Sequence, residues 1–86
     1  MVASPAPFPL IARDPAILGG EPVVRGTRVP VRTIAIIARL YHTRDAVRAA
    51  YPMLSAEAID EALAFYGSHW EEIERLIAEN EDGDAE

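Results

Sequence analysis

The chain has 86 residues, half of them apolar, and a formal net charge of −6 at pH 7. A chain of this length forms one small domain, and its apolar content is too high for a disordered protein. The absence of cysteine excludes disulfides and thiolate chemistry, and the longest apolar run is far shorter than the roughly 20 residues of a membrane span. The N-terminus lacks the basic and apolar segments of a secretory signal, so we expect a cytoplasmic location and no membrane partner.

The charge is divided unequally along the chain. Residues 1–50 hold seven of the eight arginines and three acids, which gives +4, whereas residues 51–86 hold one arginine and eleven acids, which gives −10. A basic half suits an anionic partner and an acidic half suits a basic one. Both halves can equally be solvated surface, so charge alone leaves the partner open.

Alternating prolines predict a flexible leader over residues 1–9, because proline fixes φ and removes a hydrogen-bond donor. Glycine-punctuated apolar runs then predict short β-strands over residues 10–31. A two-residue loop that starts at Gly26 fits a type II′ hairpin turn, since glycine takes positive φ at low cost. This turn would place Arg25 and Arg28 opposite each other at the end of a β-hairpin.

From Val31 onward the apolar residues recur three and four positions apart, which predicts a helix over about residues 31–41. Ile36 and Leu40 widen its apolar face. We therefore expect this helix to be the most buried one.

Two further helices are marked by capping residues. Thr43 is placed to cap a helix over residues 44–50, and Ser55 is placed to cap a third. We expect the third helix to end or kink near Gly67 and another to run to about residue 79, because glycine is unfavourable in a helix. The sequence of residues 68–71 resembles a capping box that restarts a helix.

Three helices of about 11, 7 and 12 residues, with a short break before the third, match a helix-turn-helix trihelical core. The first turns of the third helix carry acids and no cation, which argues against ordinary major-groove reading because affinity for DNA rests largely on cations. Any DNA contact must use the hairpin and the second helix. The predicted DNA-binding residues are Arg25, Gly26, Thr27, Arg28, Arg32, Arg44 and Arg48.

The alternative is that the hairpin arginines have a purely structural role. Arg25 or Arg28 would then pair locally with Glu21 or Asp14 and brace the hairpin. Gly26 and Thr27 shape the turn under either interpretation.

Apolar residues at heptad-like spacing run from the third helix toward the C-terminus. These residues are Ile59, Leu63, Tyr66, Trp70, Ile73 and Ile77. Tyr and Trp are enriched at interface hot spots, and a chain this small gains stability from oligomerising. They predict a dimer or partner interface; the alternative is that they pack in the core of their own chain.

The sequence offers no arrangement of catalytic or cofactor-binding residues. His42 and His69 are far apart and have no cysteine or second histidine near them, so metal-ligand spacing is missing. No serine lies in a nucleophile motif, and no glycine-rich loop carries a phosphate-binding lysine. We expect neither an enzyme nor a metal or other cofactor.

Two segments resemble a known family: residues 14–31, DPAILGGEPVVRGTRVPV, and residues 51–63, YPMLSAEAIDEAL. They are similar to the VapB-like antitoxin family catalogued as domain of unknown function 433, over about residues 10–66. The resemblance implies a small N-terminal β-hairpin followed by a trihelical homeodomain-like core over residues 10–66. The residue pattern beyond the matched part adds a C-terminal helix with the partner face over residues 67–80 and a disordered acidic tail over residues 81–86. The expected fold is therefore mostly α.

Members of the family often lie beside a gene for a PIN-like ribonuclease. The resemblance therefore implies the antitoxin of a type II toxin–antitoxin pair, which neutralises this toxin and represses its own operon by binding operator DNA as a homodimer. Acidic residues 71–86 would occlude the basic RNA groove of the toxin. The alternative is a protein-interaction module with a degenerate helix-turn-helix and no DNA binding.

Overall fold

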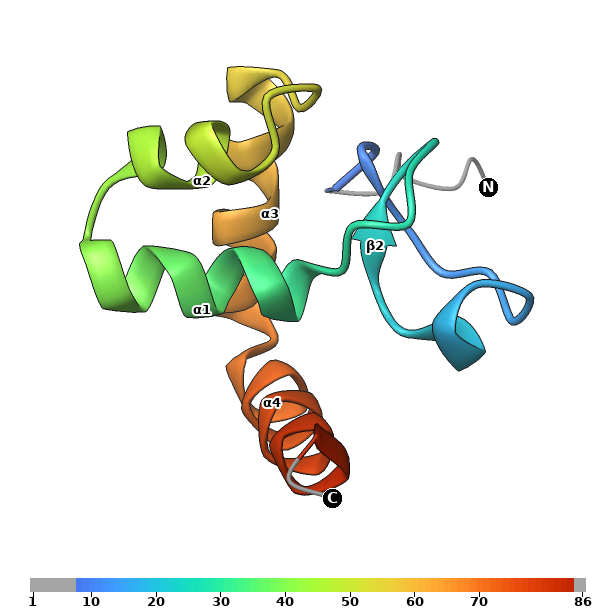
Figure 1. Ribbon diagram of the computed structural model, residues 1–86. Coiled ribbons are helices and arrows are strands. Elements are labelled where there is room, and N and C mark those ends of the chain that lie inside the picture. The colour runs from blue at the N-terminus through green and yellow to red at the C-terminus, as the bar shows by residue number, and fades with distance from the viewer. Residues whose placement is uncertain (1–7, 85–86) are drawn as a thin grey trace.

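The computed structural model describes residues 8–84, with side chains described for residues 8–80. It has a mostly helical fold with a small antiparallel N-terminal sheet, as the sequence predicts (Figure 1). In chain order the elements are β1 (Ile11–Ala12), the 3-10 helix η1 (Leu18–Gly20), β2 (Val23–Val24), α1 (Val31–Tyr41), α2 (Arg44–Ala50), α3 (Ala56–Ser68) and α4 (Trp70–Asp84).

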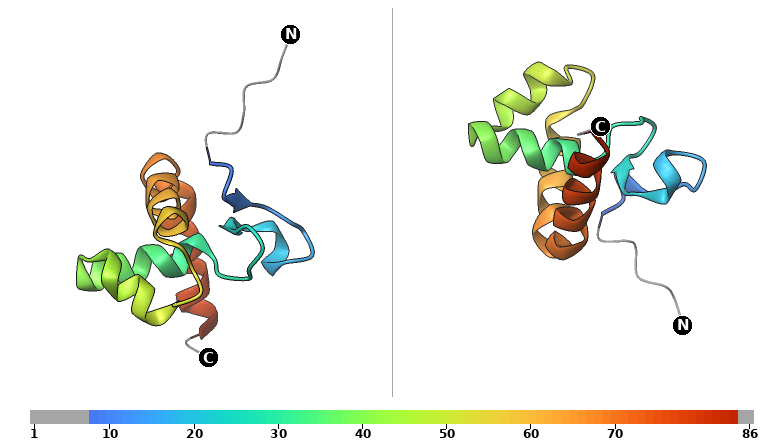
Figure 2. Two further views of the ribbon diagram at one scale, coloured as in Figure 1. Left: turned by 90° about the horizontal axis from the view of Figure 1, so that it is seen from above. Right: turned by 60° about the horizontal axis from the view of Figure 1, so that its bottom comes forward.

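The helices form one side of the molecule, and the N-terminal arm, residues 8–30, forms the other (Figures 1 and 2). Helix α1 crosses α3 and also packs against α2 and α4. The arm meets the helices through β1, which packs against α3. The arm is thus anchored at its base, while its loops project away from the helices.

The core lies between α1 and α3 and is completed by the remaining helices and the arm. Helical spacing puts Val31, Ile34 and Ala35 of α1 into this core. The fully buried isoleucines Ile34, Ile59 and Ile73 come from three different helices, so each helix is fixed by its own apolar anchor. Burying a side chain of this size stabilises a fold by about 1.5–3 kcal/mol.

The predicted starts of α2 and α3 are confirmed by their caps. The Thr43 hydroxyl accepts a hydrogen bond from the Ala46 amide at 3.1 Å, and the Ser55 hydroxyl accepts one from the Ala58 amide at 3.0 Å. These bonds satisfy amide groups that the first turn of a helix leaves without a partner.

The expected burial of α1 is wrong for its outward side. Leu40 is 66% exposed and Tyr41 is 63% exposed, while Ile36 and Ile37 are half-buried. The other helices cover α1 only on the side of its buried residues, so the apolar residues that widen its face remain in contact with solvent.

The helix break predicted near Gly67 lies at His69, between the end of α3 at Ser68 and the start of α4. The predicted capping box is absent, because the Ser68 hydroxyl donates to carbonyls of the last turn of α3 instead. Helix α4 continues to Asp84, so the segment 81–86 is helical through residue 84. Glutamate is a good helix former, which explains why the acidic segment extends the helix.

The two paired strands are not those on either side of the Gly26-Thr27 step. Strand β1 pairs with β2, with Ile11 opposite Val24, and the long connection between them contains η1. Beyond the step only an isolated bridge joins Val23 to Pro30. Proline has no amide hydrogen, which limits the pairing there.

The arm joins the fold earlier than the predicted leader boundary at residue 9. The ring of Phe8 meets the ring of Phe65 edge-on, with centroids 5.2 Å apart. Residues 1–7 of the predicted leader lie outside the described residues.

Candidate nucleic-acid interface at the arm tip

The arm tip, residues 24–29, is a tight turn that differs from the predicted one. The Thr27 amide donates to the Val24 carbonyl at 3.0 Å, so Arg25 and Gly26 are its two central residues. Gly26 has a φ of 80°. Positive φ at the second central residue is the pattern of a type II turn, which corrects the type II′ prediction.

Thr27 stabilises this turn, as its position in the sequence predicts. Its hydroxyl donates to the Val24 carbonyl at 2.8 Å and accepts from the Val29 amide at 3.0 Å. The Val24 amide donates to the Val29 carbonyl at 2.9 Å. These bonds fix the backbone on both sides of Gly26, so the residues between Val24 and Val29 are presented on a well-braced loop.

Arg25 and Arg28 are the exposed cations of the arm tip. The Arg25 amide donates to the Leu10 carbonyl at 2.7 Å, and its Nε donates to the Pro9 carbonyl at 2.8 Å. Arg28 has no ion pair or side-chain hydrogen bond to any residue that the structure describes. Neither arginine pairs with a carboxylate there, so both keep their charge available for an anionic partner.

Arg32 has a bracing role instead. Its Nε lies 2.9 Å from Glu21 Oε1, and the two side chains are only 17% and 8% exposed. The local pair that the sequence suggests for Arg25 or Arg28 is thus made by Arg32. This pair joins the loop after η1 to the first turn of α1, so a DNA contact by Arg32, which stays a prediction, would have to break it.

The two arginines of α2 differ in their partners. Arg44 Nη1 lies 2.7 and 2.6 Å from the two carboxylate oxygens of Asp60 on α3, so its charge is locally balanced. Arg48 is exposed and has no such pair among the described residues. Among the described residues, Arg48 is therefore the arginine of α2 that can contact DNA without breaking an ion pair.

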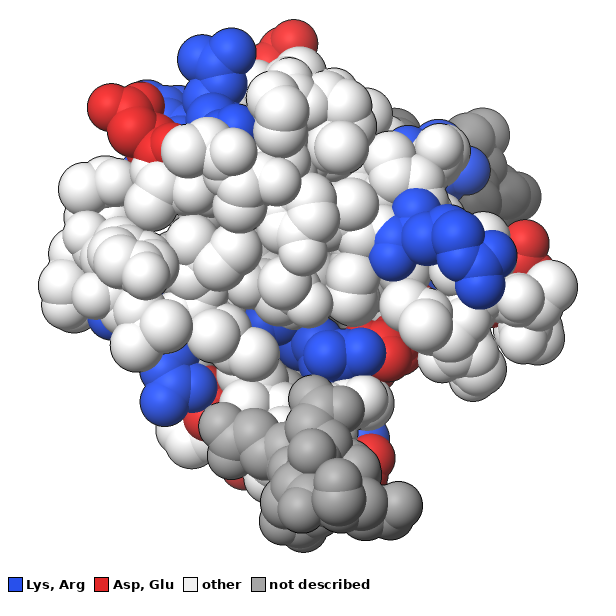
Figure 3. All heavy atoms as spheres, in the orientation of Figure 1, with Lys and Arg blue, Asp and Glu red and all other residues white. Residues whose placement is uncertain are grey.

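On the face shown in Figure 3, charged side chains lie over the arm, at the upper left, and below the middle, around a broad uncharged area. Blue side chains gather over the arm, and blue and red ones lie together at the upper left, over α2 and the start of α3. Uncharged surface separates the two groups. The predicted cations therefore do not form one continuous basic patch on this face.

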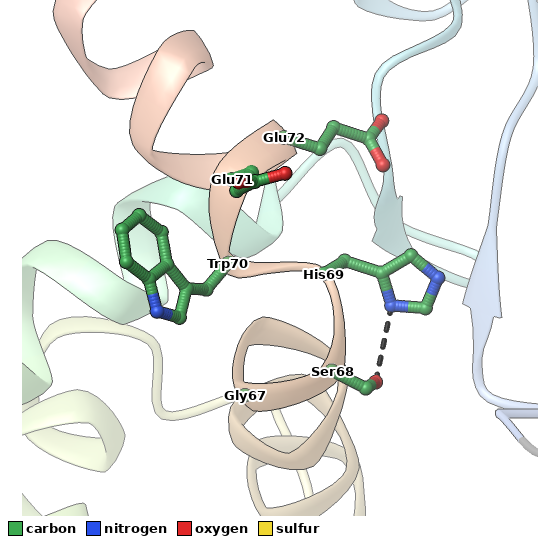
Figure 4. A pocket seen from close by; sticks show the side chains of 6 residues that line it. All are labelled: Gly67, Ser68, His69, Trp70, Glu71 and Glu72. Carbon is green, nitrogen blue, oxygen red and sulfur yellow. Dashed lines mark hydrogen bonds between the residues drawn. The ribbon is translucent and has the colours of Figure 1, made fainter.

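The junction of α3 and α4 contains a hollow of about 540 Å³ lined by residues 67–72. His69 and Trp70 point in opposite directions from it (Figure 4). The His69 ring stacks on Phe65, with centroids 4.0 Å apart and planes 4° from parallel, and its Nδ1 lies 3.1 Å from the Ser68 hydroxyl. This packing gives His69 a structural role, and the Ser68 hydroxyl beside it donates to the Ala64 and Phe65 carbonyls.

Arg13 is a structurally important residue that the sequence interpretation missed. It forms a two-pronged ion pair with Glu72 at the start of α4, with Nη2 at 2.9 Å from Oε1, and its guanidinium lies 5.6 Å from the centre of the Phe65 ring. The hydrogen bond from Arg13 lowers the pKa of Glu72 below its ordinary value. No sequence motif indicates this pair, because its members are 59 residues apart.

A second pair of this kind joins α1 to α4. Arg39 lies 3.1 Å from Glu74, which also accepts a hydrogen bond from the Tyr66 hydroxyl. This hydrogen bond raises the pKa of Tyr66.

The predicted partner interface is largely part of the chain's own core. Ile59 and Ile73 are completely buried and Ile77 is 5% exposed, so none of them is available to a partner. Leu63 and Tyr66 are half-buried. Trp70 is the residue of this set that points into solvent, at 58% exposure.

The described residues contain no group of three or more His, Cys, Asp or Glu side chains that could hold a metal ion. Within the same part of the chain, no helix is both long enough and apolar enough to cross a membrane.

A family model described as "Protein of unknown function (DUF433)" matches residues 11–66, which include the arm tip and all of the first three helices except the last two residues of α3. The chain belongs to the DUF433 family. A curated relative, the uncharacterized protein y4eO of Sinorhizobium fredii, is 46% identical over 50 residues; these cover 58% of this chain and 23% of that protein. The chain thus spans less than a quarter of that relative.

A solved structure supports the same fold. The crystal structure of a DUF433 member from Anabaena variabilis superimposes with a TM-score of 0.74 at 33% sequence identity. The match covers 80% of this chain and 68% of that one.

Proposed function

We propose that this DUF433 protein acts by binding rather than by catalysis, as the antitoxin of a type II toxin–antitoxin pair. In this role it neutralises a PIN-like ribonuclease and, as a cytoplasmic homodimer, represses its own operon by binding operator DNA. The observation that carries the DNA-binding half is the arm tip. There a hydrogen-bonded turn presents Arg25 and Arg28 beside a trihelical core of the helix-turn-helix type.

This proposal uses fewer DNA-contacting residues than the sequence predicts. Arg25 and Arg28 on the arm tip and Arg48 on α2 are exposed and unpaired with carboxylates in the described chain. Glu57 on the outside of α3 repels phosphates, and the Asp60 carboxylate there is paired with Arg44, so α3 offers no free cation for reading bases in the major groove. Binding is then mainly to the phosphate backbone, with the arm tip in a groove.

Fluorescence anisotropy on the DNA upstream of the gene tests this half. Six cations per dimer predict a log–log salt slope of about −5, or about a thousandfold weaker binding at 200 mM than at 50 mM salt. The double variant Arg25→Ala/Arg28→Ala should lose most of this slope. Arg75→Ala is the matched control, because Arg75 is an exposed arginine of α4 whose ion pair is with Glu79.

The acidic outer side of α4 supports the toxin-binding half. Glu71 and Glu79 are exposed there, whereas Ile73 and Ile77 are buried, so deleting the whole segment would remove part of the core. Substitution is the sharper test. Glu71→Gln/Glu79→Gln should weaken inhibition of the ribonuclease encoded beside the gene, while the same change at Glu57 should not.

A protein-interaction module without DNA binding is the second candidate. It is favoured by the ion pairs of Arg32 with Glu21 and of Arg44 with Asp60, which occupy two of the predicted DNA contacts. Under this alternative the anisotropy experiment shows no salt-sensitive binding, and the Arg25→Ala/Arg28→Ala variant behaves as the unmodified chain.

A further inference from the structure

The outward side of α1 carries no charge. Val31, Ile34 and Ala35 point into the core. At 3.6 residues per turn, the outward uncharged residues fall within an arc of about 140°, and the last of them, Tyr41, lies next to Ile34. These residues are Thr33, Ile36, Ile37, Leu40 and Tyr41.

Neighbouring elements extend this surface. A hollow of about 490 Å³ between α1 and α2 is lined by Ile37, Tyr41 and three alanines, Ala46, Ala49 and Ala50. Figure 3 shows a broad uncharged area over α1 and α2. We call this surface the α1–α2 face: Thr33, Ile36, Ile37, Leu40, Tyr41, Ala46, Ala49 and Ala50.

A helix on the surface of a globular protein normally turns a polar side to water, and a helix that is apolar all round is normally buried. Helix α1 is apolar on both sides, yet Leu40 and Tyr41 are 66% and 63% exposed. Its two arginines, Arg32 and Arg39, are held in ion pairs with Glu21 and Glu74. Arg39 lies at the border of the outward side, where it lines a hollow with Ile36 and Leu40. The composition of α1 is therefore that of a helix covered on both sides.

We propose that the α1–α2 face is covered by the same face of a second copy of this chain, in a two-fold symmetric dimer. A two-fold interface must be self-complementary, because the same patch contributes to both sides. This face offers large projecting side chains, Leu40 and Tyr41, beside a hollow lined by the small side chains of Ala46, Ala49 and Ala50. In a symmetric pair each copy inserts its large residues toward the hollow of the other.

The charge distribution also favours a second copy of this chain as the partner that covers the α1–α2 face. Two chains of net charge −6 repel each other over most possible contacts, and an uncharged face is the surface where that repulsion is smallest. A strongly basic or acidic partner finds no complementary group on this face. A stable dimer buries about 800 Å² per partner, which is about a seventh of the 5604 Å² accessible surface of this chain.

This inference rests on the proposed function only in that an operator-binding dimer needs two copies. Its test measures the molar mass of the free chain, without DNA or ribonuclease. Failure of the dimer and failure of DNA or toxin binding can therefore be told apart.

Sedimentation equilibrium of the full chain between about 1 and 100 μM should give twice the chain mass of 9.4 kDa. Ala49→Glu places a carboxylate in the hollow of the α1–α2 face, on an exposed helical site where glutamate is compatible with the helix. We expect the dimer dissociation constant to rise at least about a hundredfold, because the carboxylate would be buried without a partner. Ala64→Glu on the exposed side of α3 is the matched control and should leave the dimer unchanged.

A second variant guards against misfolding of the first. Leu40→Ser/Tyr41→Ser alters two exposed side chains, so the fold persists, as circular dichroism would verify, while the dimer dissociates. A monomer at 100 μM would overturn the proposal. So would a dimer that survives both Ala49→Glu and Leu40→Ser/Tyr41→Ser, since another surface would then join the copies.

Discussion

The helical part and the N-terminal arm are held in place by different forces. The helices share a continuous apolar core in which Ile34, Ile59 and Ile73 are completely buried. The arm contributes Ile11 and Val24 to that core, and Phe8, Leu10 and Val29 pack against it. Polar contacts complete its attachment. Glu21 pairs with Arg32, Arg13 pairs with Glu72, and the Leu10 amide donates to Glu61.

This difference determines how each region responds to its surroundings. Apolar burial depends little on pH or salt, whereas ion pairs weaken when a partner is neutralised or screened. The arm can therefore loosen while the helices remain folded. Since the exposed arginines Arg25 and Arg28 lie on the arm, their position relative to α2 depends on its polar attachments.

The largest effect is expected from a cavity in the helical core. Ile59→Ala removes a completely buried side chain of α3 and should lower the free energy of unfolding by about 2–5 kcal/mol. Urea denaturation followed by circular dichroism measures this change. Met53→Ala is the control, because Met53 is 67% exposed and its loss should change the midpoint little. Equal losses in the two variants would contradict the assignment of the core.

A smaller effect is expected at the base of the arm. Arg32→Ala leaves the nearly buried carboxylate of Glu21 without its partner and should cost about 1–3 kcal/mol. Arg44→Ala breaks an exposed pair with Asp60 and should cost less than about 1 kcal/mol. If Arg32 is a DNA contact rather than a brace, its variant keeps full stability and loses only DNA affinity.

Local patterns in the sequence predicted the helices well. Apolar spacing gave the bounds of α1, and Thr43 and Ser55 marked the starts of α2 and α3 because an N-cap acts within its own turn. Gly67 indicated the break before α4 to within two residues. Each of these signals acts over a few positions of the chain, so the sequence displays it directly.

Contacts between distant residues could not be predicted in this way. The Arg13–Glu72 pair joins the arm to α4, and the pairing of β1 with β2 passes over a long loop. The same limit affected the candidate site. The sequence predicted Arg32 and Arg44 as DNA contacts from their positive charge. Only the three-dimensional arrangement shows the carboxylates that balance this charge.

Replacing a glycine by alanine should change the stability in opposite directions in the arm-tip turn and in α3. Gly26 has a φ of 80° and nothing within 4 Å of an added Cβ, so Gly26→Ala should destabilise the arm tip through backbone strain of about 1 kcal/mol. Gly67 lies in α3 and its added Cβ also meets nothing within 4 Å, so Gly67→Ala should stabilise the fold by about 0.5–1 kcal/mol. Thermal unfolding of both variants checks the pair. A Gly26→Ala variant that is not destabilised would contradict the type II turn, and a destabilised Gly67→Ala variant would contradict the open helical site at Gly67.

The smallest effect is expected at low pH, where the ion pair between Arg13 of the arm and Glu72 of α4 is lost. The hydrogen bond from Arg13 lowers the pKa of Glu72 in the folded chain. A carboxyl whose pKa is lowered by folding stabilises the fold above its unfolded pKa, about 4.5 here, and this contribution disappears as the pH falls through the lower folded value. Acidification from pH 5 should therefore release the arm from α4 before the helices unfold.

Hydrogen exchange of the Leu10 amide reports this release, because that amide of the arm donates to the Glu61 carboxylate of α3. Exchange should quicken below about pH 4.5, after correction for the intrinsic rate, relative to amides within α3. Glu72→Gln should show the faster exchange already at pH 6 and lose the acid dependence, and Arg13→Ala should behave alike because it removes the same pair. If the effect of the double variant instead equals the sum of the two single effects, Arg13 and Glu72 act independently and their ion pair does not hold the arm.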